Sequence, residues 1–196
     1  MNPYRKTDKT IAFLIKQYRK LFSRQMAFDE MNVISASHEI YDEALQITER
    51  EATRLVKSVY DSHRDNGTVS ESEANGFVLA LMLSYNPVTK YVYKNEVDRK
   101  RSRFAEGVIS SDTPLEEVEL AKRLLIAMNK QFADDATFGA VVKAYQDDGV
   151  TKVRWVTAED DKRCRECRSR HGKVYPIDKI PPKPHMHCRC YVEAIK

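Results

Sequence analysis

The sequence predicts an α+β protein, with a mainly α-helical N-terminal domain and a small β-rich C-terminal module held together by zinc. Apolar residues recur at helical spacing through most of the first 147 residues. After Gly149 the pattern changes to β-branched residues around Trp155, and all four cysteines follow within the last 40 residues. We therefore expect two domains, an α-helical domain over 1–148 and a zinc-knuckle β module over 149–196.

The first part of the helical domain contains two well-marked helices. Between Val33 and Tyr60 apolar residues recur at close to 3.6 residues, with charged residues between them, which predicts a long amphipathic helix. Ser70 and Glu73 then have the spacing of a capping box, which opens a second helix. That helix contains the apolar run from Phe77 to Leu83, which is far shorter than the ~20 residues of a membrane span. We expect this run to be buried on all sides.

The next helix is predicted to begin at Asn86-Pro87, where the preceding one ends, and to run towards Ile109. It carries a basic run from Arg99 to Arg103. Further along, Thr113 to Glu116 combines an N-cap, a proline at the first helical position and a capping-box glutamate, which predicts a helix to about Phe132. Its expected core face consists of Leu115, Val118, Ala121, Leu124, Leu125 and Met128.

A last helix is expected from about Ala136 to Asp147, ending at Gly149 because glycine readily adopts the left-handed C-cap conformation. Three short strands should follow, over Val150–Thr157, Val174-Tyr175 and Cys190–Ile195. The proline-rich segment between the last two fits neither a helix nor an inner strand, so it should be extended. Three short strands bury little apolar surface, so we expect a bound metal to stabilise them.

The tail contains the ligand types that zinc prefers. Cys164, Cys167, His185 and Cys188 form a CxxC pair, a 17-residue loop and an HxxC pair, which is a spacing suited to one tetrahedral ion. Cys190 is an alternative ligand in place of Cys188 or His185, and His187 is a weaker one. A redox or disulfide role, or free structural thiols, are the alternatives. The redox role is disfavoured because no βαβ pattern surrounds the CxxC pair.

Charge is distributed unevenly along the chain. Residues 152–196 contain twelve Lys and Arg against six Asp and Glu, a net charge of +6, whereas the remainder carries −2. This asymmetry favours an anionic partner such as nucleic acid or an acidic protein surface, although a solvated basic face is equally consistent with it. The N-terminus lacks a secretory signal pattern, and we expect the clustered cysteines to bind metal in a reducing cytosol.

Signatures of common enzymes are missing from the sequence. It contains no HExxH, GxSxG or Walker motif, and the cysteine pair lacks the upstream HxE of zinc deaminases. We therefore expect a protein without catalytic activity. The alternative is a zinc-supported nucleic-acid-binding protein or a nuclease, the latter using Asp178, His185 and His187 beside the basic surface.

The tail resembles the C-terminal domain of phage Mu F-like minor capsid proteins, also called head morphogenesis proteins. The matching elements are the Trp155 strand, an aspartate pair before CxxC, Gly172 with a following aromatic residue, a proline-rich approach and a final HxxCRC. The helical segment from Pro87 to Ile109 is also similar, so that the likeness covers roughly residues 85–196.

This resemblance implies a structural virion protein of a tailed phage or prophage that acts in head assembly near the portal vertex. Its expected partners are the portal protein and the capsid or scaffold proteins, with non-specific contact to packaged DNA and no membrane association. The expected location is the virion, and the host bacterial cytoplasm during assembly. The family motif falls on Cys164, Cys167, His185, Cys188 and Cys190 of this chain.

Overall fold

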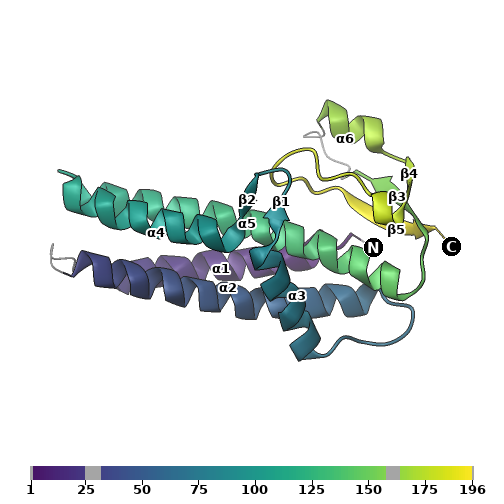
Figure 1. Cartoon of the computed structure of the whole chain (residues 1–196), viewed down its shortest axis with the longest axis horizontal. Helices are drawn as coiled ribbons and strands as arrows, with labels where there is room; N and C mark the ends of the chain where they lie inside the picture. Colours follow the sequence, from purple (N-terminus) through teal and green to yellow (C-terminus); the bar gives the residue numbers. More distant parts are fainter. Residues whose placement is uncertain (1, 25–31, 158–163, 196) are drawn as a thin grey trace.

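The structure is a computed structural model of the chain, and it describes residues 2–24, 32–157 and 164–195. Figure 1 shows long helices lying side by side, with a small sheet and a short helix at the end of the molecule that also holds the N-terminus. The long helices are α1 (Tyr4–Arg24), α2 (Val33–His63), α4 (Tyr93–Ser110) and α5 (Pro114–Asp147). The predicted α+β fold class is confirmed.

The bundle core combines apolar side chains with buried polar contacts, among them a network around Asn129. Ile40, Val59 and Val78 are fully buried among the packed helices. In the network, the Thr48 hydroxyl donates to the side-chain oxygen Oδ1 of Asn129 over 2.8 Å, and the Tyr93 hydroxyl donates to the same oxygen. Buried hydroxyls need such partners, so this network restricts how α2, α4 and α5 can pack against each other.

For helix α5, the prediction of two helices, one ending near Phe132 and the next beginning near Ala136, was wrong. It is one continuous helix from Pro114 to Asp147, because the intervening Ala133 to Asp135 contains no helix breaker and its side chains are largely buried. Gly149 follows with φ +73°, as predicted.

The start of α5 differs from the prediction. Leu115 was wrongly assigned to the core: it is 59% exposed, since the first turn of α5 extends beyond the packed part of the bundle. The predicted N-cap is also not formed: the Thr113 side chain makes no hydrogen bond to the helix backbone, and its hydroxyl donates to the Glu116 carboxylate over 3.3 Å.

Helix α3 (Glu71–Leu83) begins with the predicted capping box of Ser70 and Glu73. The expectation that Phe77 to Leu83 is buried on all sides was wrong. Val78 and Met82 are buried, but Leu79 and Leu83 are 41% and 62% exposed. The helix packs on α2 and α4, and the Phe77 ring lies against Gly139 of α5, so that Leu79 and Leu83 are on the more exposed side of the helix.

The start of the next helix was also predicted too early. Tyr85–Asn86 (β1) and Tyr91–Val92 (β2) form a two-stranded antiparallel hairpin, and α4 begins only at Tyr93. The Asn86 side-chain oxygen accepts hydrogen bonds from the backbone N–H groups of Val88 and Thr89, which stabilises the turn.

The tail contains the three predicted strands, β3 (Lys152–Val156), β4 (Val174–Pro176) and β5 (Tyr191–Ile195). They form an antiparallel sheet in the order β4-β3-β5, in which Trp155 lies opposite Val192. Trp155 is fully buried, with the Arg170 guanidinium 5.2 Å from the centre of its ring. A short 3₁₀ turn, η1 (Ile177–Lys179), connects β4 to the proline-rich segment.

The sheet packs directly on the helices. One cluster of buried side chains includes Val153, Trp155 and Val192 of the tail together with residues of α1, α2 and α5. The Tyr4 hydroxyl at the start of α1 donates to the Cys190 carbonyl over 3.1 Å. The boundary at residues 148 and 149 stays a prediction, because a shared core does not decide whether either part folds alone. No helix among the described residues is long and apolar enough to cross a membrane.

Candidate metal centre

The CxxC pair lies at the start of the short helix α6 (Arg165–Arg170). Cys164 is the N-cap in an extended conformation, and its Sγ accepts a hydrogen bond from the Cys167 backbone N–H over 3.2 Å. The Arg168 N–H bonds the Cys164 carbonyl over 3.0 Å and closes the first turn. This turn brings both sulfur atoms to the same side of the segment, so one ion can contact both.

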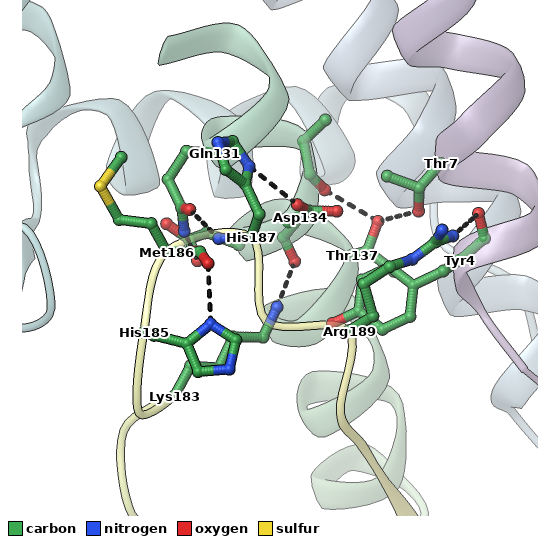
Figure 2. A network of polar contacts seen from close by, with 12 residues as sticks. Tyr4, Thr7, Gln131, Asp134, Thr137, Lys183, His185, Met186, His187 and Arg189 are labelled. Atoms are coloured by element: carbon green, nitrogen blue, oxygen red, sulfur yellow. Dashed lines mark hydrogen bonds and ion pairs between the residues drawn. The ribbon is translucent and has the colours of Figure 1, made fainter. Parts of the chain in front are cut away.

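The second half of the site is a tight turn that is held against α5. His187 has φ +55°, an unusual conformation for a residue other than glycine, and its backbone N–H donates to the buried Gln131 side-chain oxygen over 2.6 Å. Its ring lies 3.5 Å from the Asp134 carboxylate. Figure 2 shows these contacts between the turn and α5.

Lys183 anchors the proline-rich approach to the same helix. Its side chain is buried, and its ammonium donates to the Asp134 carbonyl over 3.1 Å. The ammonium also lies 4.9 Å from the centre of the Tyr4 ring and 5.3 Å from that of Phe138. A buried cation needs such partners, so Lys183 ties the approach to both α1 and α5.

Five sulfur and nitrogen ligands gather between these two halves, in two overlapping groups that could hold a metal ion. One consists of Cys164, Cys167 and His185, the other of Cys167, Cys188 and Cys190, with the ligand atoms of each group within 4.8 Å of one another. The Cys167 Sγ lies 3.3 Å from His185 Nε2 and 3.7 Å from Cys188 Sγ. Cys167 is thus common to both groups.

The hydrogen bonding of His185 suits a metal ligand. Its Nδ1 lies 2.9 Å from the Met186 carbonyl, which only accepts, so Nδ1 carries the proton. The lone pair is then on Nε2, the atom that faces Cys167. Histidine ligands commonly donate their second ring N–H in this way, which fixes the tautomer and the orientation of the ring.

The thiols differ in acidity. The pKa of Cys164 is lowered, chiefly by the hydrogen bond from the Cys167 backbone N–H. Burial raises the pKa of Cys167 to about 12, and the hydrogen bond to Cys190, together with burial, raises that of Cys188. Burial alone would lower the pKa of His185, but the Met186 carbonyl and neighbouring thiolates raise it. A bound cation would favour the thiolate form of every cysteine here.

The structure therefore brings the predicted ligands Cys164, Cys167, His185 and Cys188 together, although as two overlapping groups and not as one group of four. The alternative ligand Cys190 is 3% exposed and belongs to the group that it forms with Cys167 and Cys188. Which four bind a metal stays a prediction.

The residues considered for a nuclease do not gather. Asp178 is exposed on η1, and neither it nor His187 belongs to the ligand groups found among the described residues. Arg165 and Arg168 are exposed, as expected for a basic surface beside the cysteines. Arg163, and the aspartate pair of the family resemblance, Asp160 and Asp161, lie outside the described residues.

The supporting residues Gln131, Asp134, Lys183 and Tyr4 were not found from the sequence. Gln131 and Asp134 have the only available signal, because they are polar at buried positions of a helix, and such side chains usually need a specific partner. No local pattern relates Tyr4 to a cysteine 186 positions away.

Fold and site together define a helical protein whose C-terminal tail contains a cluster of cysteines and a histidine that could hold a metal ion. The family described as Phage Mu protein F like protein matches residues 91–193, from β2 through the ligand cluster to β5. The match spans more than half of the sequence, and the chain belongs to this family. No curated protein and no solved structure matches the chain.

Proposed function

We propose that the protein is a minor capsid or head morphogenesis protein of a tailed phage or prophage, with a structural role in assembly near the portal vertex. The observation that carries this proposal is the family match over residues 91–193, which includes every candidate metal ligand. In this proposal the protein has no catalytic turnover, resides in the virion, and is in the host bacterial cytoplasm during assembly.

We further propose that the metal is a structural zinc ion on Cys164, Cys167, His185 and Cys188. Tetrahedral zinc, with bonds of about 2.3 Å to sulfur and about 2.0 Å to nitrogen, places two sulfur ligands about 3.8 Å apart and sulfur about 3.5 Å from nitrogen. The distances of 3.7 Å between Cys167 and Cys188 and 3.3 Å between Cys167 and His185 are close to these values. Four protein ligands leave no open position, which is typical of structural zinc.

The ion would cross-link α6 to the turn that precedes β5. A structural zinc contributes on the order of 10 kcal/mol to folding in small modules. The short strands of the tail need such a contribution, although packing on the helices supplies part of it. Cys190, buried beside Cys188, would then be a neighbour of the shell that can replace Cys188 or His185.

The partners proposed for the protein are the portal and the capsid or scaffold proteins, together with non-specific contact to DNA. Exposed Arg165 and Arg168 beside the ligand cluster support an anionic partner. The same observation is the basis of the second candidate function, a zinc-supported nucleic-acid-binding protein or nuclease. Metal-dependent cleavage of DNA by the purified protein would favour a nuclease over the structural role.

Mass spectrometry of purified heads tests the main proposal. The protein should remain with mature heads through density-gradient purification, and disrupting its gene should yield fewer or defective heads. Absence from purified virions, together with normal heads after disruption, would contradict the assembly role.

A further inference from the structure

Helix α1 is the most one-sided basic element of the chain. Residues 4–24 contain seven Lys and Arg and a single acidic residue, Asp8. Their net charge of +6 equals that of the whole tail, although the sequence outside the tail sums to −2. This second basic segment is therefore hidden when charge is summed over the first 151 residues.

The cations lie on one face of the helix. At 100° per residue, Arg5, Lys9, Lys16 and Lys20 fall within about 60° of arc and span about 22 Å along the axis. All four are exposed, and none of them forms an ion pair with a carboxylate among the described residues. We call these four residues the α1 basic stripe.

A basic cleft lies at the N-terminal end of the stripe and joins it to the tail. The cleft has a volume of about 510 Å³, and the basic residues that line it are Arg5, Lys6, Lys9, His63 and Arg189. The only acidic residue in its lining, Asp8, pairs with Arg189 of the tail over 2.8 Å. The cleft therefore joins the stripe to the tail through an ion pair, and its positive charge comes from Arg5, Lys6 and Lys9.

We infer that the α1 basic stripe and this cleft form a contact surface for duplex DNA that does not depend on base sequence. Duplex DNA presents one negative charge per about 1.7 Å of axis, so a 22 Å line of cations can face phosphates along its whole length. The stripe consists of lysine and arginine, which neutralise phosphate through charge and need no particular base. The inference extends the proposed DNA contact from the tail to α1, and in that respect it rests on the proposed function.

A membrane surface fits α1 less well. An interfacial helix inserts its apolar face into the lipid, but the apolar face of α1 packs inside the bundle, where Leu14, Tyr18 and Leu21 are at most 3% exposed. Phe13, 40% exposed, is the only large apolar side chain on the outer face of α1 among the described residues. A basic helix whose apolar face is buried in the bundle is better suited to bind a polyanion such as DNA than to insert into a membrane.

Fluorescence anisotropy of the full-length protein with a 30-base-pair duplex, measured across a salt series, tests the inference. The stripe variant combines Arg5→Gln, Lys9→Gln, Lys16→Gln and Lys20→Gln. Loss of four phosphate contacts should reduce the slope of log affinity against log salt by about 3 to 4, and should weaken binding more than about tenfold near 0.1 M salt.

A matched control removes the same charge from other exposed positions, through Arg50→Gln, Arg54→Gln, Lys90→Gln and Lys94→Gln. Its salt slope should stay close to that of the wild type. The charge-conserving variant Lys9→Arg, Lys16→Arg and Lys20→Arg should keep most of the wild-type affinity. Circular dichroism confirms that each variant is folded.

An unchanged salt slope in the stripe variant would overturn the inference, as would an equal loss in the control. Binding to polyglutamate but not to DNA would also overturn it, and would assign the stripe to an acidic protein. A separate tail variant, Arg165→Gln, Arg168→Gln and Lys173→Gln, distinguishes the two proposals. If only the tail variant loses affinity, the α1 surface is refuted while the proposed DNA contact through the tail stands.

Discussion

Gln131 connects the helical bundle to the turn that carries the candidate metal ligands, so its substitution should affect both stability and metal binding. The side chain is fully buried on α5. Its oxygen accepts from the His187 N–H over 2.6 Å, and its amide donates to the Asp135 carboxylate over 2.9 Å. Gln131→Leu keeps the volume but removes both hydrogen bonds.

The substitution lowers stability because it leaves polar groups without a hydrogen-bond partner. The Asp135 carboxylate loses the hydrogen bond from Gln131 but still accepts one from Asn86. The His187 N–H faces a buried position and loses its acceptor, which costs roughly 1–3 kcal/mol. For a chain of this size, that lowers the melting temperature by roughly 2 to 12 °C. Substituting a residue that positions a metal ligand typically lowers metal affinity by about 10- to 100-fold, and we expect a loss of zinc affinity in that range here.

Thermal unfolding and competition with a chromophoric zinc chelator measure these two effects. The matched control is Gln146→Leu, the same substitution at an exposed position of the same helix, which should change stability by less than about 0.5 kcal/mol. If Gln131→Leu leaves both the melting temperature and the chelator competition unchanged, the proposed link between α5 and the metal turn is wrong.

Two further predictions concern single residues. Asn129→Ala should lower the free energy of unfolding in urea by roughly 2–5 kcal/mol, and by less when Tyr93→Phe has already removed one buried hydroxyl; an additive double-mutant cycle would contradict the network. Because His187 has φ +55°, His187→Val should be less stable than His187→Asn by about 1 kcal/mol or more in thermal melts, and equal stability would argue against the strained turn.

The sequence was informative wherever local patterns decide structure. The capping box at Ser70 and Glu73, the left-handed Gly149 and the Trp155 strand were all predicted correctly, because each depends on a few neighbouring residues. The proximity of Cys164, Cys167, His185 and Cys188 was expected for a related reason, since short ligand pairs must meet if one ion binds both.

Features that depend on tertiary packing were not predicted. The break expected between Phe132 and Ala136 does not exist, because the buried neighbours of α5 keep the helix continuous. Apolar composition alone placed Leu79 and Leu83 in the core, whereas α3 buries only one face. The contacts of Tyr4 and Gln131 with the turn join distant parts of the chain, and no local pattern encodes them.

The central claim is that one zinc ion holds the tail through Cys164, Cys167, His185 and Cys188. Trp155 is the only tryptophan and lies in the tail, so its fluorescence reports the tail while far-ultraviolet circular dichroism reports the helices. The decisive measurement is the zinc content of protein purified without chelator, compared with Cys164→Ser, Cys167→Ser. We predict one zinc per chain in the wild type. In the variant we predict little zinc and red-shifted Trp155 emission, with helical dichroism largely retained. A wild-type zinc content near zero, or unchanged Trp155 emission in the variant, would contradict the claim and return the cysteines to a disulfide or free-thiol role.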